Sequence, residues 1–159
     1  MTENPGEIAL TVPGWPPTKN EATSMLAAGH THAARVRALL EAAQQAVRRV
    51  GWTPVAGEIA LDLVVRGPSR PPSDATNYLG GVGDVLQDKT VGRGVDLTHL
   101  GELAAVALYA DDRQIKQIRY TEEQADQASY SIRIRRLGAV APSAVAAAVP
   151  AATVEETAT

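Results

Sequence analysis

Residues 74–86 read Asp74-Ala75-Thr76-Asn77-Tyr78-Leu79-Gly80-Gly81-Val82-Gly83-Asp84-Val85-Leu86, and they decide how the rest of the chain is interpreted. They follow a strand-like run and a Pro-rich turn, and Ser73 or Asp74 can cap a helix that covers roughly residues 75–88. Each of its three glycines costs such a helix about 1 kcal/mol relative to Ala. We therefore expect the glycines to allow a close approach to the helix backbone.

One face of this helix is chemically unusual. Asn77 and Asp84 are seven residues apart, which places them on the same face with Gly80 and Gly81 between them. The face has two interpretations. It is a surface that faces a metal or a phosphate, or it consists of a cap, solvated polar side chains and glycines against which a neighbouring helix packs.

The rest of the chain predicts a small α/β (α+β) domain. Alternating apolar residues predict strands at 7–12, 58–66, 115–121 and 129–137, and helical spacing predicts a helix at 33–50 that ends before Gly51. Residues 89–102 are typical of an insertion or mobile loop, and 103–109 of a strand or short helix. We expect a mixed sheet of about four strands packed with two main helices.

Composition limits the functional classes. The chain has no Cys, which excludes disulfides and Cys-ligated zinc. No apolar run approaches the roughly 20 residues that span a bilayer, and the first residues lack the features of a signal peptide, so we expect a cytoplasmic protein with no membrane partner. Residues 7–138 are the expected domain, and 1–6 and 139–159 the expected disordered tails.

Net charge gives only weak support for nucleic-acid binding. The formal net charge is −3, with 15 basic and 18 acidic residues. Glu3, Glu155 and Glu156 lie in the expected tails, so the domain itself is balanced. A basic surface usually supplies affinity for nucleic acids. Here any positive surface depends on the acidic residues clustering elsewhere.

A second pair of carboxylates follows at Asp111-Asp112, beside the strand predicted at 115–121. Adjacent carboxylates usually form a solvated turn. Carboxylates from separate elements that converge are also what a hard divalent cation requires, because Mg²⁺ prefers oxygen ligands. The functional interpretation gains weight because Asp74, Asp84 and this pair occur in one small domain.

These residues carry a resemblance over residues 7–137. The segment Pro16-Pro17-Thr18-Lys19-Asn20, residues 74–86 and Asp111-Asp112-Arg113-Gln114-Ile115 resemble the RusA family of Holliday-junction resolvases. The family pattern Asp-x-Asp-Asn-x-x-Lys is followed four residues later by Asp and then x-Leu. Asp74, Asn77, Asp84 and Leu86 fit this pattern without a gap, and Asp111-Asp112-x-Gln114 fits the family's later pair.

The resemblance implies a Mg²⁺-dependent (or Mn²⁺-dependent) endonuclease of branched DNA, a homodimeric hydrolase of DNA recombination and repair. It implies catalytic roles for Asp74, Asp111 and Asp112, metal binding by these three with Asp84, and support from Thr76 and Asn77. The carboxylates of Asp74 and Asp112 are then expected about 4–6 Å apart. Candidate nucleic-acid contacts are Lys19, Arg70, Lys89, Arg113 and Lys116.

Two departures from the pattern bear on activity. Thr76 stands where the family has its second Asp, and Gly80 where it has a Lys. A hydroxyl is a weaker ligand than a carboxylate, and the missing cation would stabilise charge on the scissile phosphate. Lys89 or Arg93 could replace that cation. The alternative to an endonuclease is therefore a non-catalytic nucleic-acid-binding or interaction protein that has kept the fold.

Three other groups have two interpretations each. His30 and His32 are surface-loop residues or metal ligands, and the former is favoured. Trp15 and Trp52 are core or dimer-contact residues rather than base-stacking platforms. The basic residues at 133, 135 and 136 form a solvated strand face or a DNA-facing strip.

Overall fold

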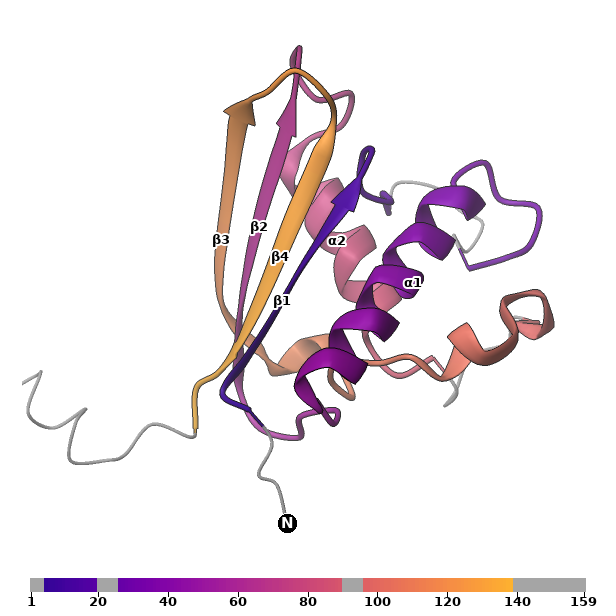
Figure 1. The fold of residues 1–159 in the computed structure, drawn as a ribbon, viewed down its shortest axis with the longest axis vertical. Coiled ribbons are helices and arrows are strands. Elements are labelled where there is room, and N and C mark those ends of the chain that lie inside the picture. The colour runs from indigo at the N-terminus through magenta and orange to yellow at the C-terminus, as the bar shows by residue number, and fades with distance from the viewer. Residues whose placement is uncertain (1–4, 20–25, 90–95, 139–159) are drawn as a thin grey trace, which may run out of the picture.

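The computed structural model describes residues 5–19, 26–89 and 96–138. It contains a four-stranded mixed sheet of strand order β1-β4-β2-β3, with helices on one face (Figure 1). The strands are β1 (Glu7–Pro13), β2 (Ile59–Gly67), β3 (Ile115–Gln124) and β4 (Ser129–Arg136). β4 pairs antiparallel with β1 and β2, and β2 pairs parallel with β3. The expected α/β fold is confirmed.

Both predicted helices form. α1 (Ala33–Val50) has the expected bounds and ends at Gly51, whose φ of 74° is the left-handed conformation of a helix C-cap. α2 (Ala75–Leu86) begins after Asp74 as predicted but ends two residues earlier than expected. It stops there because Gln87 leaves the helix to form a bridge with Tyr109.

Short 3₁₀ segments fill the part of the chain that the sequence left ambiguous. η1 (Thr98–Ala105) lies in the region expected to be a loop followed by a strand or helix, and η2 (Asp112–Gln114) precedes β3. Parts of the chain expected as tails or loop, at 1–4, 90–95 and 139–159, lie outside the described residues. In the described part, no helix combines the length and the apolar character needed to cross a membrane.

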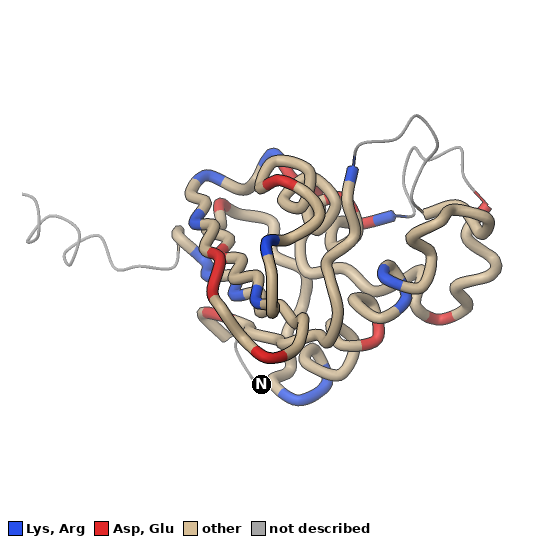
Figure 2. Tube along the Cα trace, turned by 90° about the horizontal axis from the view of Figure 1, so that it is seen from above, with Lys and Arg blue, Asp and Glu red and all other residues tan. Residues whose placement is uncertain are grey.

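Charged residues of both signs are interspersed over the described chain (Figure 2). The balance of charges inferred from the sequence therefore does not separate into one acidic and one basic face. Any affinity for a polyanion must come from a local arrangement of side chains.

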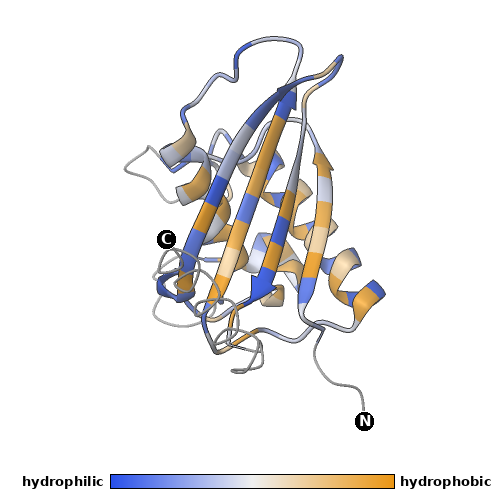
Figure 3. Cartoon of the chain, turned by 90° about the vertical axis from the view of Figure 1, so that its left-hand side faces the viewer, coloured by the Kyte–Doolittle hydropathy of each residue, from blue (hydrophilic) through white to orange (hydrophobic). Residues whose placement is uncertain are grey.

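The core lies between the sheet and the helices. Hydrophobic and hydrophilic residues alternate along the strands, which buries one face of the sheet (Figure 3). The buried apolar side chains include Leu10 of β1, Leu61 of β2, Ile134 of β4, Leu40 of α1 and Val82 of α2. Trp52 is also buried, and its indole N–H donates to the Leu108 carbonyl at 3.0 Å, as expected of a core residue.

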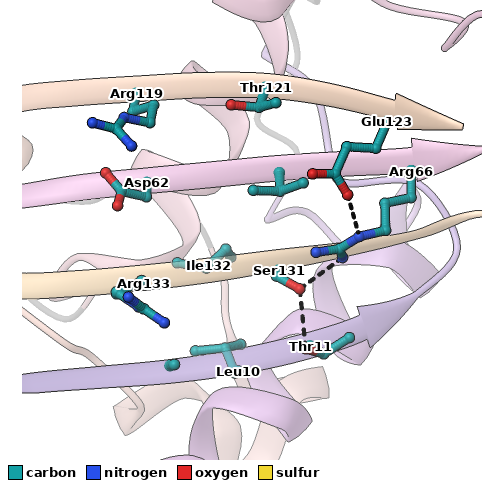
Figure 4. Close-up of a pocket in the computed structure, with 12 residues that line it drawn as sticks. Leu10, Thr11, Asp62, Arg66, Arg119, Thr121, Glu123, Ser131, Ile132 and Arg133 are labelled. Carbon is teal, nitrogen blue, oxygen red and sulfur yellow. Dashed lines mark hydrogen bonds and ion pairs between the residues drawn. The ribbon is translucent and has the colours of Figure 1, made fainter.

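The opposite face of the sheet is open and polar. Figure 4 shows Arg66, Arg119 and Arg133 on it, together with Asp62, Glu123 and the hydroxyl groups of Thr11 and Ser131. Arg66 pairs with Glu123 at 3.0 Å, and Arg133 lies 3.7 Å from Glu7. Arg133 of β4 and Arg66 of β2 thus lie beside acidic groups, which is typical of a solvated strand face.

Lys89 holds the end of α2 in place. Its side chain is 1 % exposed, and its ammonium group donates to the carbonyls of Val85, Gln87 and Val106. The first two are carbonyls at the end of α2, where positive charge is favourable. Lys89 therefore joins this helix end to the segment that follows η1. Its predicted role in DNA binding is wrong, because the ammonium group is buried and hydrogen-bonded to backbone carbonyls inside the protein.

Replacing Lys89 with Met should lower the free energy of unfolding by about 2 kcal/mol. The apolar stem keeps its packing, but buried carbonyls lose their donor, and the relief of burying a charge offsets only part of that loss. Urea denaturation of the variant measures the effect. Lys116→Met, at an exposed lysine, is the matched control and should shift stability by less than about 0.5 kcal/mol. Equal stability of the two variants would contradict the structural role.

Candidate metal and nucleic-acid site

The segment Pro16–Lys19 crosses directly over α2. A Cβ atom placed on Gly81 would lie 2.1 Å from the Pro17 carbonyl oxygen, a distance that no side chain tolerates. The Lys19 backbone N–H donates to the Asn77 carbonyl at 3.1 Å, which fixes the crossing. Gly81 therefore admits a neighbouring backbone, as expected, although the neighbour is an irregular segment and not a helix.

Lys19 covers the bare surface at Gly80. A Cβ atom on Gly80 would lie 3.3 Å from the Cβ and 3.4 Å from the Cδ of Lys19, so the apolar stem of the lysine rests on the helix backbone. The ammonium group then reaches Asp84 Oδ2 at 3.0 Å. The lysine side chain is 56 % exposed and the Asp84 side chain 14 % exposed, so the cation keeps a solvent-facing side. A cation thus lies over the position where the family pattern expects one.

Asp112 lies near the same helix, at Gly83 close to its C-terminal end. Its Cβ lies 3.9 Å from the position of a Cβ on Gly83, and its backbone N–H donates to Gln87 Oε1 at 2.9 Å. Burial raises the pKa of Asp112, and the negative charges of Asp84 and Asp111 raise it further, while Lys19 opposes them. Asp84, Asp112 and Lys19 therefore form one interacting cluster, which we call the α2 cluster.

Tyr109 closes the buried side of the α2 cluster. Its hydroxyl donates to the Gly83 carbonyl at 2.8 Å, and burial raises the pKa of Tyr109, with smaller contributions from Asp112 and Asp84. Nothing in the sequence pattern assigned Tyr109 or Gln87 to the site. Neither residue belongs to a motif, and tertiary contacts such as the bridge between Gln87 and Tyr109 bring them to the helix end.

Asp111 is committed to local structure. Its carboxylate accepts from the Arg113 backbone N–H at 2.8 Å and pairs with the Arg113 guanidinium at 2.8 Å. These contacts lower the pKa of Asp111 to about 2. Gln114 completes a capping box, since its Oε1 accepts from the Asp111 N–H at 2.8 Å. The Asp111 carboxylate is next to Asp112 in the chain, but it already forms an ion pair with Arg113.

Asp74 lies at the opposite end of α2. It caps the helix by accepting from the Asn77 N–H at 2.9 Å and from the Thr76 hydroxyl at 3.2 Å. Asp74 precedes Gly83, the residue that Asp112 contacts, by nine positions, which is about 14 Å along a helix. The expected approach of Asp74 and Asp112 to 4–6 Å is therefore not formed. Thr76 and Asn77 support the cap rather than the α2 cluster.

The remaining predicted DNA contacts divide between the two ends of α2. Arg113 and Lys116 are exposed and line a groove beside Asp111, near the α2 cluster. Arg70 is exposed in the turn that precedes Asp74. Arg93 lies outside the described residues.

The histidines have structural roles close to the site. His30 is 9 % exposed, and its Nδ1 accepts from the His32 backbone N–H at 3.0 Å. The His32 ring lies 3.1 Å from the Thr18 hydroxyl and so anchors the residue next to Lys19. The favoured interpretation as surface-loop residues is wrong for His30, because the segment before α1 packs inward.

The donors fit only one kind of metal site. Among the described residues, no group of three or more His, Asp and Glu side chains is arranged to hold a metal ion. Asp84 and Asp112 remain as a pair, and burial together with the negative charge of Asp84 raises the pKa of Asp112. Mg²⁺ is commonly held by one or two carboxylates together with substrate phosphates. The pair fits that arrangement and does not fit a cage made by the protein alone.

Comparisons with known proteins add no family assignment. No protein-family model matches the chain, and no curated protein matches it. The geometry of the α2 cluster and the sequence motifs that form it therefore carry the evidence for function.

Proposed function

We propose that this protein is a RusA-like, Mg²⁺-dependent endonuclease of branched DNA, such as the four-way Holliday junction. The observation that carries the proposal is that Lys19, α2 and Asp112 meet, because these come from the three separate segments on which the resemblance depends. A chance likeness of three short motifs would not require them to be neighbours in space.

Each member of the α2 cluster has a role in this proposal. Asp84 and Asp112 would hold the metal ion, together with a phosphate of the DNA. When bound, Mg²⁺ supplies polarisation of the phosphate and a more acidic bound water. Lys19 stabilises negative charge on the scissile phosphate, in place of the lysine absent at Gly80. Arg113 and Lys116 contact the flanking backbone, and Asp74 preserves the start of α2.

A symmetric substrate favours a symmetric enzyme. A four-way junction has two-fold symmetry, so a homodimer that presents two copies of the site suits it. A DNA substrate is also consistent with the cytoplasmic location expected from the sequence.

The second candidate is a non-catalytic protein that binds branched nucleic acid. Two observations favour it. Asp74 is separated from the α2 cluster by most of the helix, and Lys19 already neutralises Asp84 at 3.0 Å. In this case Lys19, Arg113 and Lys116 bind phosphates and no bond is cleaved.

The two candidates are separated by assays on synthetic four-way junctions with Mg²⁺ or Mn²⁺. The endonuclease predicts symmetric nicks by the wild type, which Asp112→Asn removes. Asp74→Asn, which changes a cap residue, should retain most cleavage per folded molecule. Tight binding of junctions without cleavage at any metal concentration would establish the second candidate. No preference for junctions over duplex DNA would exclude both.

Replacing Lys19 with Met should separate metal binding from cleavage. The Met side chain keeps an apolar stem over Gly80 but removes the ion pair with Asp84, so the affinity for Mn²⁺ should increase. Cleavage should nevertheless fall about tenfold or more, because the phosphate loses a cation. Calorimetric Mn²⁺ titration and single-turnover cleavage measure the two effects. Lys19→Arg is the control and should retain more activity than Lys19→Met. A parallel fall in both quantities would contradict this role.

A further inference from the structure

Ile118 is an exposed apolar side chain on the edge strand β3. It is 57 % exposed, and the only other large hydrophobic residue that is exposed in the described chain is Val50, at 36 %. A single apolar side chain at the surface is common and needs no explanation by itself. The surroundings of Ile118 therefore decide whether it has a function.

The side chain of Ile118 lies on the side of the sheet that carries the helices. Ile118 is the partner of Leu61 in β2, which is buried in the core between sheet and helices, and neighbouring partners point to the same face. The next residue, Arg119, lies on the open face (Figure 4), as the alternation along a strand requires. β3 is the outermost strand and lies farthest from α1 (Figure 1), so the helices leave Ile118 uncovered. Ile118 thus shares a side of the sheet with the α2 cluster.

Ile118 is also close to the α2 cluster along the chain. η2 leads from Asp112 directly into β3, and Ile118 follows Asp112 by six residues. A short 3₁₀ turn and the start of a strand cover about 16 Å over this interval. That length corresponds to about five nucleotide steps of a DNA strand. A strand with one phosphate at the α2 cluster therefore brings nearby nucleotides to Ile118.

Basic side chains occupy the interval between Asp112 and Ile118. Arg113 and Lys116 are exposed and border the same groove at the start of β3. Such cations bind backbone phosphates and fix the position of a DNA strand without reading its bases. They can therefore hold a strand beside Ile118.

The acidic residues of β3 limit this contact to its first half. Glu122 lies on the same side of the strand as Ile118 and accepts from the Tyr120 hydroxyl at 2.7 Å. Glu123 lies on the open face, where it pairs with Arg66. Both carboxylates repel phosphates, so a DNA strand held at the start of β3 must leave the sheet near Ile118.

We propose that Ile118 selects branched DNA by inserting its side chain between bases at the branch point. Apolar side chains such as Ile unstack a base step when they insert. Unstacking costs least where pairing and stacking are already interrupted, so the insertion favours a branch over a continuous duplex. The inference rests on the proposed function, because it assigns the specificity of the same site. Ile118 contacts bases and takes no part in the cleavage of the phosphodiester bond.

Replacing Ile118 with Ala tests the proposal through base stacking. The probe is a four-way junction with aminopurine, a fluorescent adenine analogue that stacking quenches, at the branch point, and EDTA keeps the DNA intact. Wild-type protein should increase the fluorescence of this junction but not that of a duplex carrying the same base. Ile118→Ala should lose the increase. Its affinity for the junction should fall about tenfold, because most of the inserted apolar surface is removed, while its affinity for the duplex stays unchanged.

Two further variants serve as controls. Val50→Ala removes the exposed apolar side chain at the end of α1 and should behave as the wild type, and Ile118→Leu should restore most of the fluorescence increase. Circular dichroism verifies that each variant is folded. Junction binding by the wild type without a fluorescence increase, or an increase that survives Ile118→Ala, would overturn the role of Ile118 and leave the proposed endonuclease intact. Absence of junction binding by the wild type would overturn both.

Discussion

Replacing Asp112 with Asn should reduce metal-dependent cleavage of four-way junctions by about 100-fold or more. The change keeps the size of the side chain and removes the negative charge that faces Asp84. In the proposed mechanism Asp112 and Asp84 are the two protein ligands of the metal, so the loss of either charge leaves one carboxylate. Single-turnover cleavage at saturating enzyme measures the chemical step without a contribution from binding.

Stability separates this role from a structural one. The pKa of Asp112 is raised in the folded protein, so its charged form opposes folding at pH values above that pKa, and stability increases as the pH falls through it. Asp112→Asn should therefore not lower the free energy of unfolding at pH 7. The free energy of unfolding of the variant should also change less as the pH falls into the acidic range. Asp62→Asn, on the open face of the sheet, is the matched control and should leave cleavage unchanged. A destabilised Asp112→Asn variant would indicate a structural residue.

Replacing Gly81 with Ala should lower the free energy of unfolding by about 3 kcal/mol or more. The new Cβ would meet the Pro17 carbonyl oxygen at 2.1 Å and the Thr18 Cα at 2.9 Å. These are backbone atoms, so the clash cannot be relieved by a side-chain rotation. Either α2 or the Pro16–Lys19 segment must move, and chemical denaturation of the variant measures the cost.

The same substitution should impair junction binding in the molecules that stay folded. Displacing the Pro16–Lys19 segment moves the Lys19 ammonium group away from Asp84. Gly57→Ala is the control, because a Cβ on Gly57 would contact nothing within 4 Å. Near-neutral stability of Gly81→Ala would show that the segment does not lie against α2 as described.

The sequence predicted the fold well because its patterns are local. Alternation of apolar residues located all four strands, and helical spacing located α1 and α2. The 3₁₀ segment η1 was missed because its residues lack a period. Its position depends on contacts such as the hydrogen bond from Lys89 to the Val106 carbonyl, which joins residues far apart in the chain.

The candidate site was predicted less completely. Motif matching identified Asp84, Asp112 and Lys19 but could not determine their distances. Asp74 and Asp112 were expected together because their motifs are shared by one family, whereas the length of α2 keeps them apart. Lys89 was expected as a surface cation, since burial of a lysine against three carbonyls has no sequence signature. The sequence also carried no sign that Lys19 lies over Gly80, because that contact depends on how the segment before α1 crosses α2.

The location of the metal is the most direct test of the account. Mn²⁺ broadens NMR signals of nearby backbone amides, and the protein, at 16.7 kDa, is small enough for such spectra. With junction DNA present, we predict broadening centred on Gly83, Asp84 and Asp112, and its loss in Asp112→Asn. Broadening centred on Asp74, or no localised broadening at any Mn²⁺ concentration, would contradict a metal-dependent site at the α2 cluster.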